Sequence, residues 1–292
     1  MTLDIAVDGL RVDYGSFTAV RDLSFTLAGG KIHGLLGRNG SGKSTLLSVI
    51  AAFRKATAGS VRVGGQQPFE NAEIVRQICF IRESGDTAGG SVKASLDFAA
   101  AFRPNWDADY AEALLDRFEI QKKKSVDALS RGKKSALGVT LGLASRAPLT
   151  IFDESYLGMD APSRYAFYEE LLDDYLANPR TIVLSTHLIE EVGSLFEEVV
   201  ILDRGGLVLH EETETLRERG AAVTGPAETV DRFTASLRVL NEQRLGGTKS
   251  ATVFGALTAE QRDRARADGL ELGPVGIQDL FVHLTGSGEE RR

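Results

Sequence analysis

The stretch GLLGRNGSGKSTLLSVI, from Gly34 to Ile50, limits the folds open to this chain more than any other. The apolar residues before it are typical of a short buried strand, and those after it recur at helical spacing. Gly37, Gly40 and Gly42 therefore lie on a turn from strand to helix, where several backbone N–H groups can point inward. Because the helix adds roughly half a positive charge at its N-terminus, the turn predicts a site for phosphate.

The same turn matches the spacing G-x-x-x-x-G-K-[ST]. We expect Lys43 to contact the β- and γ-phosphates of a nucleotide and Ser44 to supply an oxygen ligand to Mg²⁺. A glycine-rich loop that matches by accident is the alternative, and the strand before the loop and the helix after it argue against that alternative. The predicted nucleotide-binding residues of this loop are Gly37, Asn39, Gly40, Ser41, Gly42, Lys43, Ser44 and Thr45.

Other apolar patterns predict an α/β fold. QICFIR, LTIFDES and TIVLSTH are typical of buried parallel strands, whereas LDIAVDGLRVDYG and VRDLSFTLAGG alternate like antiparallel strands. We expect a mixed, largely parallel sheet, an N-terminal antiparallel β subdomain, and a helical subdomain inserted at about residues 84–146. Residues 1–212 would form a nucleotide-binding domain, and residues 213–292 a small α+β accessory region.

Charge and hydropathy exclude some partners. The chain has 292 residues and a net charge of −7, which argues against nucleic acid or anionic lipid as its main electrostatic partner. No apolar run reaches about eighteen residues, so we expect that the chain itself does not cross a membrane. Its 42% hydrophobic and 26% charged residues are ordinary for a globular protein.

Two carboxylates follow the apolar run LTIF. Asp153 and Glu154 would lie at the carboxyl end of a central strand, where open α/β sheets bind their ligands. Asp153 can hold Mg²⁺, and Glu154 can polarise a water molecule toward the γ-phosphate. An acidic pair after a strand is by itself usually a solvated start of a loop. Its place after a phosphate loop on the same sheet favours the catalytic interpretation.

A second turn that can bind an anion opens a long predicted helix. Ser130, Arg131 and Gly132 offer a hydroxyl, free N–H groups and the N-terminus of that helix. The alternative is an ordinary helix cap made by Ser130. Its position just ahead of the acidic strand favours a role in nucleotide binding.

These residues together resemble the nucleotide-binding subunit of ATP-binding cassette (ABC) transporters, of the bacterial type whose permease is a separate chain. The resemblance covers roughly residues 3–212. GRNGSGKST resembles the Walker A motif of that family, LSRGK its signature motif, and LTIFDE its Walker B motif. LGMD, which contains Asp160, resembles its D-loop, and LSTH, which contains His187, resembles its H-loop. Tyr14 matches the aromatic residue that stacks on adenine, although a half-buried strand tyrosine is the alternative.

The resemblance implies a P-loop NTPase that binds ATP and Mg²⁺ and hydrolyses ATP. Two cassettes, identical or paralogous, would sandwich two ATP molecules, so that Ser130, Gly132 and Asp160 of one copy serve the ATP held by the other. His187 would contact the γ-phosphate and orient the attacking water. The cassette would dock on a transmembrane permease at the cytoplasmic face of the membrane and power transport, with export favoured.

Three positions depart from the family pattern. Glu83 stands where the Q-loop usually has glutamine, Arg131 where the signature often has glycine, and Ser155 where proline usually follows Walker B. Glu83 can still act as a ligand to Mg²⁺. Alternatively it stays outside the metal shell, or it faces solvent and is neutralised by Arg82.

Two other functions are compatible with a cassette. A soluble ABC-type ATPase of translation or DNA maintenance would have two fused cassettes or a long coiled coil, and neither pattern occurs in the sequence. A regulatory subunit that does not hydrolyse ATP would lack Glu154 or His187, and both residues occur.

Overall fold

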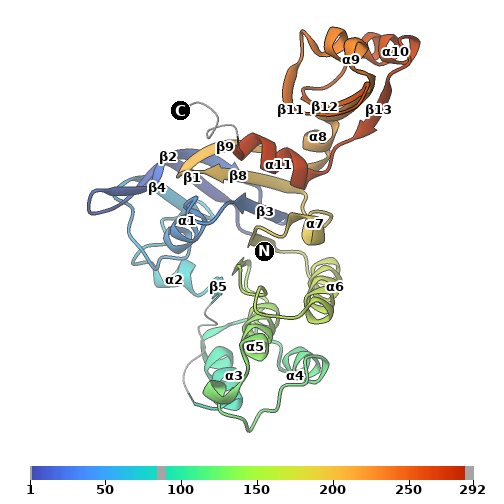
Figure 1. Ribbon diagram of the computed structural model, residues 1–292. Helices are drawn as coiled ribbons and strands as arrows, with labels where there is room; N and C mark the ends of the chain where they lie inside the picture. The colour runs from blue at the N-terminus through green and yellow to red at the C-terminus, as the bar shows by residue number, and fades with distance from the viewer. Residues whose placement is uncertain (1, 84–89, 287–292) are drawn as a thin grey trace. The chain divides into compact units, whose positions relative to one another are not determined.

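The computed structural model describes residues 2–83 and 90–286. The chain divides into two compact units, which we describe separately (Figure 1). The first unit comprises Met1–His187 and Ser194–Leu207, and the second comprises Leu188–Gly193 and Val208–Arg292. A domain boundary after residue 212 stays a prediction. Across the described ranges, no helix has both the length and the apolar character that crossing a membrane requires.

Three antiparallel strands form the predicted N-terminal sheet. They are β1 (Ile5–Tyr14), β2 (Phe17–Leu27) and β4 (Ala58–Val63), in the order β2-β1-β4. β1 and β2 form a hairpin across Gly15 and Ser16, and Gly15 has the positive φ of 62° that tight turns favour. Tyr14 pairs with Phe17 across this hairpin, so the two aromatic residues are neighbours at its tip.

A largely parallel sheet forms the centre of the first unit. Its strands, in the order β5-β6-β7-β3-β8-β9, are β5 (Ile78–Arg82), β6 (Leu149–Asp153), β7 (Thr181–Thr186), β3 (Ile32–Gly37), β8 (Glu198–Asp203) and β9 (Gly206–Glu212). The pairs from β5 to β8 are parallel, as the continuous apolar runs predict. Their register aligns Arg82, Asp153 and Ser185, so the residues that follow these strands meet at one edge.

Helices complete the first unit. They are α1 (Lys43–Ile50), α2 (Ala72–Val75), α3 (Val92–Phe102), α4 (Ala108–Arg117), the 3₁₀ helix η1 (Val126–Ala128), α5 (Arg131–Ala144) and α6 (Ala161–Ala177). No strand of the described residues separates α3, α4 and α5, and α3 and α4 both contact α5 (Figure 1). Ser91, Asp107 and Ser130 begin these three helices by accepting a hydrogen bond from a backbone N–H of the first turn. The predicted helical subdomain is confirmed; residues 84–89 lie outside the described part.

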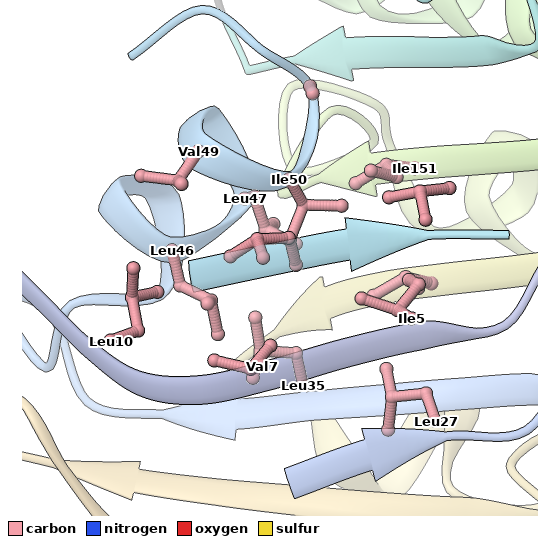
Figure 2. Close-up of a cluster of buried hydrophobic side chains, with 14 of the residues drawn as sticks. Ile5, Val7, Leu10, Leu27, Leu35, Leu46, Leu47, Val49, Ile50 and Ile151 are labelled. Atoms are coloured by element: carbon pink, nitrogen blue, oxygen red, sulfur yellow. The ribbon is translucent and has the colours of Figure 1, made fainter. Parts of the chain in front are cut away.

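The core of the first unit fixes the phosphate-loop helix between the two sheets. Leu46, Leu47, Val49 and Ile50 of α1 are buried. Figure 2 shows them among side chains of β1, β2, β3 and β6. The sheet residues labelled in that cluster are Ile5, Val7, Leu10, Leu27, Leu35 and Ile151. Packing on both sides therefore fixes the position of helix α1, and with it the position of the phosphate loop that precedes the helix.

The second unit is the predicted α+β appendage. Its antiparallel sheet, in the order β11-β12-β10-β13, contains β10 (Gly220–Pro226), β11 (Arg238–Leu245), β12 (Thr248–Phe254) and β13 (Glu271–Pro274). Its helices are α7 (Ile189–Val192), α8 (Thr213–Glu218), α9 (Ala227–Thr234), α10 (Ala259–Ala267) and α11 (Ile277–Gly286). A separate core forms around Val223, Phe233 and Val253.

Candidate active site

The phosphate loop runs from the end of β3 to the start of α1. Gly42 precedes the helix with a φ of 102°, and a Cβ atom at this position would lie 2.6 Å from the carbonyl oxygen of Ala19. Only glycine combines that backbone conformation with so close an approach. Gly40 also has a positive φ, of 79°, so both glycines shape the loop as the sequence predicts.

A cavity of about 540 Å³ lies against this loop. Its lining residues are Tyr14, Phe17, Ala19, Asn39, Gly40, Ser41, Gly42, Lys43, Ser44, Thr45, Glu83 and Glu154. All of these except Phe17 and Ala19 are residues that the sequence assigns to nucleotide binding, to metal binding or, for Glu154, to catalysis. Phe17 lies beside Tyr14 in the hairpin, and the two-residue turn in VDYGSF is the signal that could have placed it here.

Lys43 and Glu154 meet at this cavity. Lys43 is 5% exposed, and its Nζ donates to the carbonyl oxygens of Gly37, at 2.7 Å, and Arg38, at 3.3 Å. The same Nζ lies 3.2 Å from Oε1 of Glu154. Nδ1 of His187 lies 3.4 Å from that carboxylate oxygen. The structure thus brings together the cation expected to bind phosphate and the two residues expected to act on water.

The backbone of Glu154 is unusual. Its φ of 49° is in the left-handed region that glycine favours, and its N–H donates to the carbonyl oxygen of Ser185 at 3.2 Å. A conformation of this kind costs about 1–2 kcal/mol in a residue with a Cβ atom. The parallel strands β6 and β7 hold it and turn the carboxylate toward Lys43. Such strain often accompanies a functional position.

Asp153 is buried next to the phosphate loop, with 5% of the residue exposed. Burial raises the pKa of Asp153, and the charge of Glu154 adds to this effect, while the hydroxyls of Ser44 and Ser185 and the charge of Lys43 oppose it. Oδ1 of Asp153 and Oγ of Ser41 have no hydrogen-bond partner in the described residues. A buried carboxylate oxygen without a partner fits a hard cation such as Mg²⁺.

Protein side chains alone do not make a metal cluster here. Within residues 2–83 and 90–286, no group of three or more His, Cys, Asp or Glu side chains could hold a metal ion. Mg²⁺ typically uses one or two protein ligands together with substrate phosphates. The pair Ser44 and Asp153 fits that use.

Tyr14 lies on the rim of the cavity, with 43% of the residue exposed. Its hydroxyl and the hydroxyl of Thr45 are 3.4 Å apart. The guanidinium carbon of Arg54 lies 4.0 Å from the centre of the Tyr14 ring. Arg54 lines a different hollow, with Pro68 and Phe69. One face of Tyr14 therefore has a cation over it, a contact that no local sequence pattern signals.

Six predicted residues are absent from the lining of this cavity. Gly37, Asp153 and His187 adjoin or contact residues that line it, whereas Ser130, Gly132 and Asp160 form a second group. Ser130 caps α5 by accepting a hydrogen bond from the N–H of Lys133 at 3.3 Å, and Asp160 caps α6 by accepting one from the N–H of Ser163 at 3.0 Å. The hydrogen bonds from Ser163 lower the pKa of Asp160. A Cβ atom at Gly132 would lie 3.1 Å from the carbonyl oxygen of Gly158, so the signature and the D-loop pack closely.

The neighbour of Glu83 differs from the one considered in the sequence analysis. Its Oε1 accepts a hydrogen bond from the Nη2 of Arg131 at 2.5 Å. Arg82 instead has its guanidinium carbon 5.3 Å from the centre of the Phe53 ring. The two residues of the ion pair are 48 positions apart in the chain, so spacing gives no signal for the contact.

Comparisons with known proteins find similarity to ABC transporter proteins. The ABC transporter family model matches residues 20–156. The chain is 26% identical to the ABC transporter ATP-binding protein YtrB of Bacillus subtilis (strain 168), over 97% of this chain and 93% of the relative. It is 28% identical to the Nod factor export ATP-binding protein I of Paraburkholderia xenovorans (strain LB400), over 97% of each chain.

A solved structure of an ATP-binding subunit of an ABC transporter superposes with a TM-score of 0.64 at 24% identity, over 73% of this chain and 91% of that one. This likeness shows the fold of the ABC ATPases. The family match and the relatives that align along nearly the whole sequence show that the chain is similar to ATP-binding subunits of ABC transporters.

Proposed function

We propose that this chain hydrolyses ATP, as a dimer of cassettes, to drive export of a substrate through a separate transmembrane permease. The observation that carries the proposal is a pair of contacts: Lys43 contacts Glu154, both of which line one cavity, and Glu154 contacts His187. That arrangement supplies a cation for phosphate, a base for water and a group that orients the base, which are the parts that phosphoryl transfer needs.

In this mechanism the backbone N–H groups of the phosphate loop and Lys43 bind the triphosphate. Ser44 and Asp153 would hold Mg²⁺, which when bound neutralises charge on the phosphate oxygens. Glu154 accepts a proton from the attacking water, and His187 orients the carboxylate that does so. The ring of Tyr14 offers a surface on which adenine can stack.

The dimer follows from the separation of the two groups of residues. Ser130, Gly132 and Asp160 are not in the lining of the cavity that holds the phosphate loop. In a two-fold dimer they would face the ATP of the other copy, so that each site uses residues of both chains.

A hollow of about 620 Å³ supports docking of a permease. Phe53 and Phe102 border it, and each is 62% exposed. Phe80 also lines it, and Arg76 and Arg103 add positive charge. Exposed aromatic side chains that gather around a hollow are typical of protein interfaces. We propose that a cytoplasmic segment of the permease with apolar and acidic side chains docks here. The export direction rests on the name of the Nod factor relative.

Co-purification and reconstitution test the proposal. The chain is expressed with the permease genes that neighbour its own and extracted in detergent, and ATPase activity is compared with the permease present and absent. We expect co-purification and stimulated hydrolysis, and we expect Phe102→Asp to abolish both. The matched control is Phe69→Asp, since Phe69 lines a different hollow. Hydrolysis unaffected by any permease would overturn the coupling to transport, and co-purification with ribosomes or DNA would favour a soluble ATPase.

A further inference from the structure

Two residues that depart from the family pattern contact each other. Arg131, in the signature, and Glu83, after strand β5, form an ion pair with 2.5 Å between Nη2 and Oε1. The usual residues at these positions, glycine and glutamine, carry no charge and could not form it. The two departures therefore make a new link between the Q-loop and the signature within one chain.

Arg131 also packs on the D-loop. A Cβ atom at Gly158 would lie 3.0 Å from Cγ of Arg131 and 3.3 Å from its carbonyl oxygen. Gly158 lies between Glu154 and Asp160 in the sequence. The aliphatic part of the Arg131 side chain thus packs on the loop that follows strand β6, while its guanidinium contacts Glu83.

The ion pair connects two places with different expected roles. Glu83 lines the cavity that holds the phosphate loop of its own chain. Arg131 is the first residue of α5 and follows Ser130, which is expected to face the ATP of the other copy. A single contact therefore joins one ATP site to the surface that completes the second.

The exposure of this ion pair allows Arg131 to exchange Glu83 for another partner. The side chains of Arg131 and Glu83 are 74% and 49% exposed, so water weakens their attraction. A guanidinium can bind phosphate through two parallel hydrogen bonds, whereas the hydrogen bond described to Glu83 comes from Nη2 of Arg131. A γ-phosphate that reached Arg131 would therefore displace Glu83.

We propose that Arg131 is a positioning residue that couples the two ATP sites of the dimer. While the signature is not engaged, Arg131 holds the carboxylate of Glu83. When the triphosphate of the partner copy reaches the signature, Arg131 turns to it and releases Glu83 toward the cavity of its own chain. This inference rests on the proposed ATP hydrolysis by a dimer.

A double-mutant cycle tests the coupling. Hydrolysis is measured against ATP concentration for the unaltered protein, Glu83→Gln, Arg131→Gln and the double variant, with Lys134→Gln as the control for removal of a cation from the same helix. We expect a Hill coefficient above one in the unaltered protein and near one in each single variant. The fold-loss of kcat/KM in the double variant should be at least threefold smaller than the product of the fold-losses in the two single variants.

Two further variants separate coupling from a structural ion pair. Arg131→Lys should keep part of the cooperativity. Exchange of the charges, Glu83→Arg with Arg131→Glu, should restore a structural pair and the Tm but not the cooperativity, since a carboxylate at position 131 would repel phosphate. Multiplicative single effects, or cooperativity restored by the exchange, would overturn the inference while leaving hydrolysis established. Absence of hydrolysis in the unaltered protein would overturn the proposed function itself.

Discussion

Nζ of Lys43 lies 3.2 Å from Oε1 of Glu154, so the cation proposed to bind phosphate and the proposed base contact each other within the protein itself. A triphosphate that binds Lys43 competes with Glu154 for the ammonium group, and the negative charge of Glu154 opposes the phosphates. Binding of ATP would thus loosen the carboxylate from Lys43 and leave it available to water. The contact with His187, at 3.4 Å, keeps it oriented.

The first prediction concerns this base. Glu154→Gln should lower kcat by about 10²–10⁴-fold, because the amide cannot accept the proton of water, while ATP affinity is retained or rises because the repulsion is gone. Turnover with saturating ATP and equilibrium binding measure the two effects. Glu190→Gln, at an exposed acid near His187, serves as the control. Near-normal turnover in the Glu154 variant would show that Glu154 is not the base.

A second prediction concerns Asp153. Burial raises the pKa of this carboxyl, so the folded chain binds the proton more tightly than the unfolded chain does. The contribution that protonated Asp153 makes to the free energy of unfolding is therefore lost as the pH rises through the pKa of the unfolded chain and then that of the folded chain. At neutral pH the charge of Asp153 destabilises the fold, so Asp153→Asn should raise the Tm of the nucleotide-free protein at pH 7. The difference should shrink as pH falls through the raised pKa of the folded chain and be lost below about pH 4, the ordinary pKa of an aspartate.

The same substitution should remove the dependence of nucleotide affinity on Mg²⁺, because the amide is a poor ligand for a hard cation. Titration of Mg²⁺ at fixed ATP measures it. Asp203→Asn, at the end of strand β8 of the same sheet, is the matched control and should keep the dependence. A variant of Asp153 that still responds to Mg²⁺ as the parent does would show that another residue holds the ion.

A third prediction concerns Arg54. The guanidinium over Tyr14 orients the ring, and a cation over an exposed aromatic ring is worth about 0.5–1 kcal/mol. Arg54→Met keeps the stem and removes the charge, so ATP should bind about two- to fivefold more weakly. Inorganic tripolyphosphate, which has no base, should bind unchanged. Lys55→Met is the control, because Lys55 lies over Phe69 instead. If ATP and tripolyphosphate lose affinity equally, Arg54 acts on the phosphates and not on the base.

Sequence patterns predicted the parts of this protein that depend on local chemistry. The glycines of the phosphate loop, the apolar strands and the carboxylates after β6 each have a signal within a few residues. Contacts between distant elements have none: Arg131 with Glu83 and Arg54 with Tyr14 depend on how helices and strands pack. The left-handed φ of Glu154 was also not predictable, because glutamate disfavours it and tertiary contacts impose it.

The last prediction concerns a buried ion pair between helix α6 and the residue that precedes strand β7, which Arg146 extends to the helical subdomain. Arg180 and Asp174 are 3% and 5% exposed, and Nη2 of the arginine lies 2.6 Å from Oδ2 of the aspartate. Arg146 lies 3.6 Å from the other oxygen of Asp174 and 3.0 Å from Asp107, the cap of α4. Asp174 thus forms ion pairs with two arginines, of which Arg146 also pairs with Asp107 at the start of a helix in the subdomain.

Arg180→Met should lower the free energy of unfolding by about 3–5 kcal/mol, because it leaves the carboxylate of Asp174 buried with a weaker partner. The double variant Arg180→Met with Asp174→Leu should recover much of this loss, since it removes the unpaired charge as well. Denaturant titrations followed by circular dichroism measure both, with Arg164→Met as a control at an arginine on α6. If the double variant is less stable than Arg180→Met alone, Asp174 stabilises the subdomain chiefly through Arg146, and the pair with Arg180 is secondary.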